Sequence, residues 1–191
     1  MRFTPHSEIE GQHAILSPSN HHWVNDEPEK LLTRVANRRM AALGTRKHEA
    51  AKMCIELGIK MENNGLTVNR YVNDCIGYRM KPEVPLFVSW NAFGTVDAIS
   101  FRREDEDQMV LRIFDLKTGV TDTSFRQLKL YAAFFCIEYK VRPMEIGYDL
   151  RIYQNDAVKM CEIDPEEIVY LIDRTIESDK LINKAMAEEV I

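Results

Sequence analysis

Two short stretches of the chain carry carboxylates at positions where a metal site could form. The stretch "RIFDLKTG" (112–119) places Asp115 at the end of an apolar run, with Lys117 two residues later, and "GTVD" ends in Asp97. Neighbouring carboxylates repel each other away from water, and hard cations such as Mg²⁺ or Mn²⁺ suit their oxygens. A metal ion beside an ammonium group can activate water and stabilise phosphorane charge, which indicates phosphodiester hydrolysis.

Three predicted strands must bring these residues together. Each is short, rich in β-branched or aromatic residues and bounded by turn signals, and they cover residues 83–90, 94–102 and 109–117. If the last two form an antiparallel hairpin with its tip in 103–108, Asp97 faces Asp115 with their Cβ atoms about 5 Å apart. Lys117 then lies on the same face of its strand as Asp115.

A similar register around Trp90 places Glu83 near Asp97, which makes Glu83 a further candidate ligand. The alternative is an ordinary strand end. An Asp/Lys pair such as Asp115 and Lys117 is, taken alone, most often an exposed ion pair of little energetic weight.

Helical patterns surround the strands. Apolar residues recur at helical spacing from about Pro28 to Met61, with a break expected at Gly44 and an end at "NNG" (63–65). The other predicted elements are a helix over 67–80, a helix over 124–139, a hairpin of 144–154 and 157–164 around Asn155 and Asp156, and a C-terminal helix over 164–191.

The composition is typical of a compact protein. We expect one domain over residues 1–191, which begins with an irregular arm over residues 1–15. The chain is 45% hydrophobic and 29% charged, without linker-like segments. Its four cysteines are widely spaced, which favours reduced thiols. No signal peptide or membrane span is recognised, so a cytoplasmic location is expected. The net charge of -5 argues against a general polyanion binder, although residues 33–47 are basic.

The motifs, taken in order, resemble those of RecB-type nucleases of the PD-(D/E)XK superfamily. The segment "GTRKHEAA" (44–51) is similar to the family's helical G-T-x-x-H motif, and "GTVD" (94–97) to its G-x-x-D motif. Further along, "FDLKTG" (114–119) is similar to its (D/E)-x-K-T-G motif and "QLKLY" (127–131) to its Q-x-x-x-Y motif. The segment "LSPSNHHW" (16–23) resembles the opening of phage-encoded and CRISPR-associated members, so the resemblance covers 16 to about 135. It implies an α/β fold with a restriction-endonuclease-like core, in which helices flank a mixed central β-sheet.

The resemblance also implies roles for individual residues. The implied metal ligands are the side chains of His48, Asp97 and Asp115 and the backbone carbonyl of Leu116, with Glu83 added from the register. Lys117 is the implied catalytic lysine, acting with Asp97 and Asp115. Gln127 and Tyr131 lie four residues apart on one helix face, where both can contact the same DNA strand or support the site.

Two positions depart from the family pattern. CRISPR-associated members usually hold an iron–sulfur cluster through one cysteine after the opening Trp and three near the C-terminus. Here Asn25 and Asp26 stand in the first region, and Cys161 is the sole cysteine in the second, so no iron–sulfur cluster is expected. Asp115 replaces the more usual Glu, which the pattern permits.

The implied function is that of an Mg²⁺- or Mn²⁺-dependent DNA exonuclease in recombination, repair or phage DNA processing. It would act on linear ends in the cytoplasm of a bacterium or a phage-infected host cell. Homo-oligomers or a recombination partner protein are further expectations, whereas a membrane partner is not expected. Two alternatives stay open: a structure- or sequence-specific endonuclease on the same core, and a nuclease-like module that only binds nucleic acid.

Overall fold

The structure is a computed structural model that describes residues 24–104, 108–119, 121 and 123–188. The predicted arm over 1–15 and the segment "LSPSNHHW" lie outside these residues. The chain divides into two compact units, residues 1–45 and 46–191, and each is described by itself. The prediction of a single domain stays a prediction. Between residues 24 and 188, no helix has both the length and the apolar character needed to cross a membrane.

Helix α1 (Pro28–Leu57) begins at the predicted proline and runs through Gly44 without the expected break. In the first unit, Asp26 pairs with Lys30 at 2.8 Å and with Arg34, close to the positive end of the helix. Salt bridges to these two cations lower the pKa of Asp26. The helix therefore begins with a neutralised charge cluster as well as a proline.

The end of α1 corrects the sequence prediction. Gly58 adopts a left-handed φ of +67° and its N–H donates to the Ile55 carbonyl, so the helix ends at Leu57 and not at "NNG". Helix α2 (Thr67–Gly77) follows and is three residues shorter than predicted.

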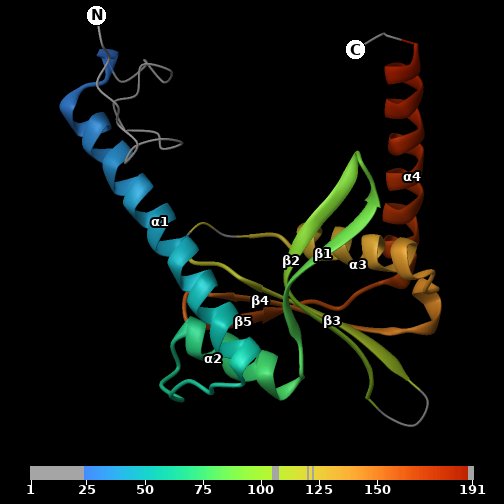
Figure 1. The fold of residues 1–191 in the computed structure, drawn as a ribbon, viewed down its shortest axis with the longest axis horizontal. Helices are drawn as coiled ribbons and strands as arrows, with labels where there is room; N and C mark the ends of the chain where they lie inside the picture. The colour runs from blue at the N-terminus through green and yellow to red at the C-terminus, as the bar shows by residue number, and fades with distance from the viewer. Residues whose placement is uncertain (1–23, 105–107, 120, 122, 189–191) are drawn as a thin grey trace, which may run out of the picture. The chain divides into compact units, whose positions relative to one another are not determined.

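A five-stranded mixed sheet forms the centre of the second unit (Figure 1). Its strands, in spatial and chain order, are β1 (Lys81–Ser89), β2 (Ala92–Arg103), β3 (Met109–Leu116), β4 (Gly147–Gln154) and β5 (Ala157–Met160). All neighbours are antiparallel except β3 and β4, which are parallel. Helices flank this sheet, which confirms the predicted α/β fold and its mixed sheet.

The parallel pair is connected by helix α3 (Arg126–Tyr139) and the short 3₁₀ helix η3 (Pro143–Glu145), because parallel neighbours need a long crossover. The predicted hairpin is confirmed as β4 and β5, although both strands are shorter than the predicted 144–154 and 157–164, and residues 144 and 145 belong to η3. Asn155 and Asp156 both have positive φ, 52° and 55°, as a tight hairpin turn requires.

The C-terminal helix α4 (Pro165–Ala187) begins as predicted. The Asp164 side chain accepts a hydrogen bond from the Glu166 N–H at 2.9 Å, and Pro165 occupies the first helical position. This cap fixes where the helix starts after the sheet.

Both faces of strand β3 are covered by apolar side chains. One layer joins Leu111 and Ile113 to residues of α3 and α4, and the other joins Phe114 and Leu116 to α2 and the end of α1. Seven of the eight residues of β3 are buried in consequence. Any polar side chain at the end of this strand must therefore leave bulk water.

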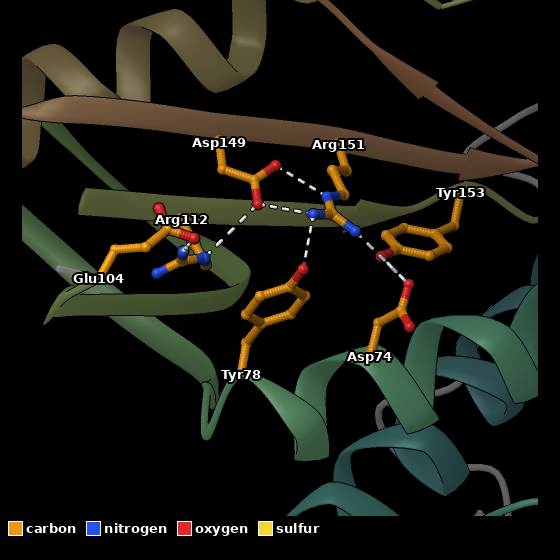
Figure 2. A network of polar contacts seen from close by, with 7 residues as sticks. All are labelled: Asp74, Tyr78, Glu104, Arg112, Asp149, Arg151 and Tyr153. Atoms are coloured by element: carbon orange, nitrogen blue, oxygen red, sulfur yellow. Dashed lines mark hydrogen bonds and ion pairs between the residues drawn. The ribbon is translucent and has the colours of Figure 1, made fainter.

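A network of guanidinium groups ties α2 to the sheet (Figure 2). Arg151 of β4 forms two hydrogen bonds with Asp149, at 2.7 and 2.8 Å, and donates to the Tyr78 hydroxyl at 3.0 Å. The Tyr78 ring also contacts the guanidinium groups of Arg151 and Arg112. Arg112 pairs with Glu104 at 2.6 Å. The buried Arg112 and the half-buried Arg151 thus have anionic and aromatic partners, which offset the cost of removing their charges from water.

Strand β1 is an edge strand, and its free side is partly occupied. The Phe87 N–H donates to Glu138 Oε2 of α3 at 2.8 Å. Pro85, two residues before Phe87 and therefore on the same side of the strand, has no backbone donor. This edge therefore offers few unpaired N–H groups to another strand.

We predict that Gly58→Ala lowers the free energy of unfolding by about 1–2 kcal/mol, because an L side chain is strained at a φ of +67°. Gly77→Ala is the matched control. Neither added Cβ would meet an atom within 4 Å, but Gly77 lies at the end of α2 without a positive φ, so its change should raise stability by up to about 1 kcal/mol. Chemical denaturation measures both, and equal effects would contradict the assignment of Gly58 as the helix stop.

Candidate metal centre

The register of β2 and β3 brings two aspartates to one place. Ala98 pairs with Phe114, and the next positions along this antiparallel register are Asp97 and Asp115. The predicted pairing of the two strands is confirmed. Asp97 Oδ2 also accepts a hydrogen bond from the Leu116 N–H at 2.9 Å, which holds its carboxylate beside the end of β3.

The register of β1 and β2 adds Glu83 to this place. Pro82 pairs with Ala98, so Glu83 stands opposite Asp97 as predicted. His48, from the end of α1, approaches Asp97 with its Nδ1 3.6 Å from Oδ2. The potential ligand atoms of His48, Glu83 and Asp97 all lie within 4.8 Å of one another. An imidazole nitrogen and two carboxylates at this separation can hold a divalent cation.

The backbone of Glu83 is unusual for a strand. Its φ is +51°, in the left-handed region, which costs a non-glycine residue on the order of 1–3 kcal/mol. The strained residue is the one whose carboxylate completes the group with His48 and Asp97.

Asp115 and Lys117 form a second part of the site. Lys117 Nζ lies 3.0 Å from Asp115 Oδ1 and donates to Gln127 Oε1 at 3.1 Å. Asp115 is only 4% exposed, and its Oδ2 has no hydrogen-bond partner among the residues described. A buried carboxylate oxygen without a partner is costly, and a cation is a natural partner for it.

The structure brings only some of the predicted ligands into one compact group. Within the described part of the chain, the compact ligand group contains His48, Glu83 and Asp97 but not Asp115, whose Oδ1 is held by Lys117. Leu116, predicted to act through its carbonyl, ends β3 next to Asp115, with its own side chain buried in the core. Its role as a ligand stays a prediction.

The electrostatics of the site reflect two neighbouring carboxylates with limited access to water. Burial, followed by the charge of Asp115, raises the pKa of Asp97 to about 6. Burial also raises the pKa of Asp115, although the Lys117 ammonium opposes this shift. A bound divalent cation would favour the ionised form of both groups. The donor set and the orphaned oxygen of Asp115 fit such an ion.

Gln127 and Tyr131 of α3 both support the site from one helix face. Gln127 accepts from Lys117, and the Tyr131 hydroxyl donates to the Thr95 carbonyl at 2.7 Å. A Cβ on Gly94 would lie 3.0 Å from the Tyr131 ring, so glycine at this position lets α3 approach β2. The supporting role is visible in these contacts, and contact with DNA stays a prediction.

Sequence reasoning missed Gln154 and the backbone of Tyr153. The Tyr153 carbonyl accepts from the Lys117 N–H at 2.9 Å. Gln154 is buried, and its Nε2 donates to the carbonyls of Gly119 and Thr121, both at 2.7 Å. These bonds shape the segment after Lys117. The sequence signal was weak, because β4 also carries Asp149 and Arg151 and a third polar residue at its end does not stand out.

Comparisons with known proteins identify no family. No protein-family model matches the chain, and no curated protein matches it. One solved structure, described as "Crystal structure of SSO0001", is 15% identical, with a TM-score of 0.30. The alignment covers 52% of this chain and 51% of the other, so it spans about half of that protein.

We predict that Mn²⁺ raises the melting temperature more at neutral pH than at about pH 5. In the metal-free protein the pKa of Asp97 is raised, so protonation of this carboxyl group stabilises the fold. This stabilisation is fully present when the pH is below the ordinary pKa of an aspartate, and it is lost as the pH rises through about 6. Metal binding needs the ionised carboxylate, so its stabilisation appears over the same range. At a metal concentration of 100 times Kd, it should reach about 2.7 kcal/mol.

Asp97→Asn should abolish this metal-induced shift, whereas Asp173→Asn, at an exposed position of α4, should leave it unchanged. Thermal unfolding with Mn²⁺ and with EDTA measures both variants. An undiminished shift in Asp97→Asn would mean that the metal binds elsewhere.

Proposed function

We propose that the chain is a divalent-metal-dependent deoxyribonuclease with a PD-(D/E)XK core. It hydrolyses phosphodiester bonds from linear DNA ends in recombination, repair or phage DNA processing. The observation that carries the proposal is the pairing of Lys117 with the buried Asp115, whose second oxygen has no partner, at the register position opposite Asp97.

The geometry supports one set of residues as the proposed metal ligands. His48, Glu83 and Asp97 offer three converging ligand atoms. Asp115 lies outside this compact group, and its Oδ2, which has no hydrogen-bond partner, would be a further ligand. When bound, Mg²⁺ or Mn²⁺ polarises a phosphoryl oxygen and lowers the pKa of a bound water. The carboxylates supply the negative charge that retains such an ion, and their raised pKa values in its absence support this role.

We assign Lys117 the role of orienting the attacking water or stabilising the negative charge that develops on the phosphoryl group. Its ammonium group is fixed between Asp115 and Gln127, and its backbone N–H is held by Tyr153. A cation held in this way can orient the attacking water or donate to a phosphoryl oxygen as negative charge develops there. Asp115 pairs with the ammonium group, and Gln127 limits the directions in which its remaining protons point.

The proposed preference for DNA ends is supported by a sequence motif of α3. Gln127 and Tyr131 match the Q-x-x-x-Y pattern, which in the resembling nucleases more often accompanies processing of DNA ends. In this protein both side chains already support the site through Lys117 and Thr95. Their spacing therefore agrees with the proposed core, and the substrate must be tested directly.

We predict that the purified protein degrades linear DNA with Mg²⁺ or Mn²⁺ but not with EDTA. Lys117→Ala should lower the rate by at least about a hundredfold, as loss of one positioned electrostatic group does in other enzymes. Asp115→Asn should do the same. Lys180→Ala, an exposed lysine of α4, is the control and should keep full activity.

Linear, nicked and closed-circular DNA separate the alternatives in the same assay. Cleavage of closed circles would replace the exonuclease by an endonuclease. DNA binding without metal-dependent cleavage would replace the enzyme by a binding module. Equal degradation by wild type, Lys117→Ala and Asp115→Asn would show that the site is assigned wrongly.

A further inference from the structure

The tip of the β1–β2 hairpin exposes three aromatic rings to solvent. Phe87 is 44% exposed, Trp90 86% and Phe93 62%. The rings of Phe87 and Phe93 are stacked, with centroids 6.4 Å apart, and Trp90 meets Phe87 edge-on at 5.4 Å. We call these three residues the aromatic platform. A cluster of large rings left in water marks a binding surface more often than isolated apolar residues do.

The aromatic platform lies on the same face of the hairpin as the metal ligands. Val96 packs into the core layer of α3, and Gly94 lies against the Tyr131 ring of that helix. Because side chains alternate along a strand, Phe93 and Asp97 point away from α3. They are four positions apart along the strand, which is about 13 Å.

The surface between these two points is open. Phe87 pairs with Phe93 and Pro85 with Thr95, and continuing this register by two positions places Glu83 opposite Asp97. Pro85 and Thr95 are both exposed. One continuous face therefore runs from the metal ligands to the rings.

Helix α4 holds the tip of the hairpin in place (Figure 1). Asp179 Oδ1 accepts hydrogen bonds from Ser89 Oγ at 2.6 Å and from Asn91 Nδ2 at 2.9 Å. Asn91 Nδ2 also lies 2.9 Å from Asn183 Oδ1. These bonds lower the pKa of Asp179, so its carboxylate stays charged as an acceptor. A platform anchored in this way needs little ordering when a ligand binds.

We propose that the aromatic platform stacks unpaired bases of a single-stranded DNA segment whose backbone continues to the metal centre. The placement of that backbone rests on the proposed nuclease function. Unpaired bases expose ring faces that stack on aromatic side chains irrespective of sequence, whereas bases inside a duplex are already stacked on each other. The substrate class is therefore single-stranded DNA or a frayed end.

The test uses the Lys117→Ala protein in EDTA, so that binding is measured without cleavage. Phe93→Ala and Trp90→Ala, added separately, should raise the Kd for labelled oligothymidylate about tenfold or more, the scale of one lost base stack. The Kd for a blunt duplex should change much less. Met144→Ala, at an apolar position 62% exposed in η3, is the matched control and should change neither Kd.

Oligonucleotides with an abasic site at successive positions provide a second readout. Where the missing base is the stacked one, Phe93→Ala should cause no further loss of affinity, because both changes remove the same contact. Unchanged affinity for oligothymidylate, an equal loss for duplex, or additive losses at every abasic position would each overturn the proposal. So would sedimentation showing that the wild type is a dimer and Trp90→Ala a monomer.

The experiments can contradict the aromatic platform and the nuclease function independently of each other. If platform variants lose single-strand affinity while the wild-type protein cleaves no DNA with Mg²⁺ or Mn²⁺, the platform stands and the nuclease proposal falls. If the wild type cleaves DNA and platform variants bind single strands as before, the nuclease stands and the platform falls.

Discussion

Repulsion between two carboxylates that leave water together is the constraint on which the rest of this site depends. Asp97, which is half-buried, and Asp115, which is buried, stand at opposed register positions, and each has a pKa above its ordinary value because it is partly or largely removed from water. The Leu116 N–H, the Lys117 ammonium and the His48 imidazole all approach this pair. Each reduces the cost of negative charge, yet one oxygen of Asp115 stays without a partner.

The fold explains why that charge is buried at all. Strand β3 is covered on both faces, so its final residues reach the site from inside the protein. The parallel neighbour β4 then supplies a backbone acceptor for Lys117, and α3, the connection between the two strands, supplies Gln127. A single β3–α3–β4 unit thus positions the lysine from three directions. The same connection brings Tyr131 against Gly94, which links three separate sequence motifs through direct contact.

Much of this arrangement follows from local sequence. The turn centres at Trp90 and within 103–108 were enough to place Glu83 opposite Asp97, and Asp97 opposite Asp115, because an antiparallel register is determined by its turn. The end of α1 was predicted wrongly, since Gly58 and "NNG" are both plausible stops and only the backbone conformation distinguishes them. Gln154 was missed because its partners, Gly119 and Thr121, are distant in sequence and become neighbours only after the crossover.

The contact between Glu138 and the Phe87 N–H has a consequence for assembly. Exposed rings beside an unprotected sheet edge are the usual starting point of strand-to-strand aggregation. Here the edge donor nearest to the rings is already occupied by a carboxylate, and Pro85 removes a further donor from the free side of β1. The hairpin can therefore display apolar surface to a ligand while its backbone discourages polymerisation into a larger sheet.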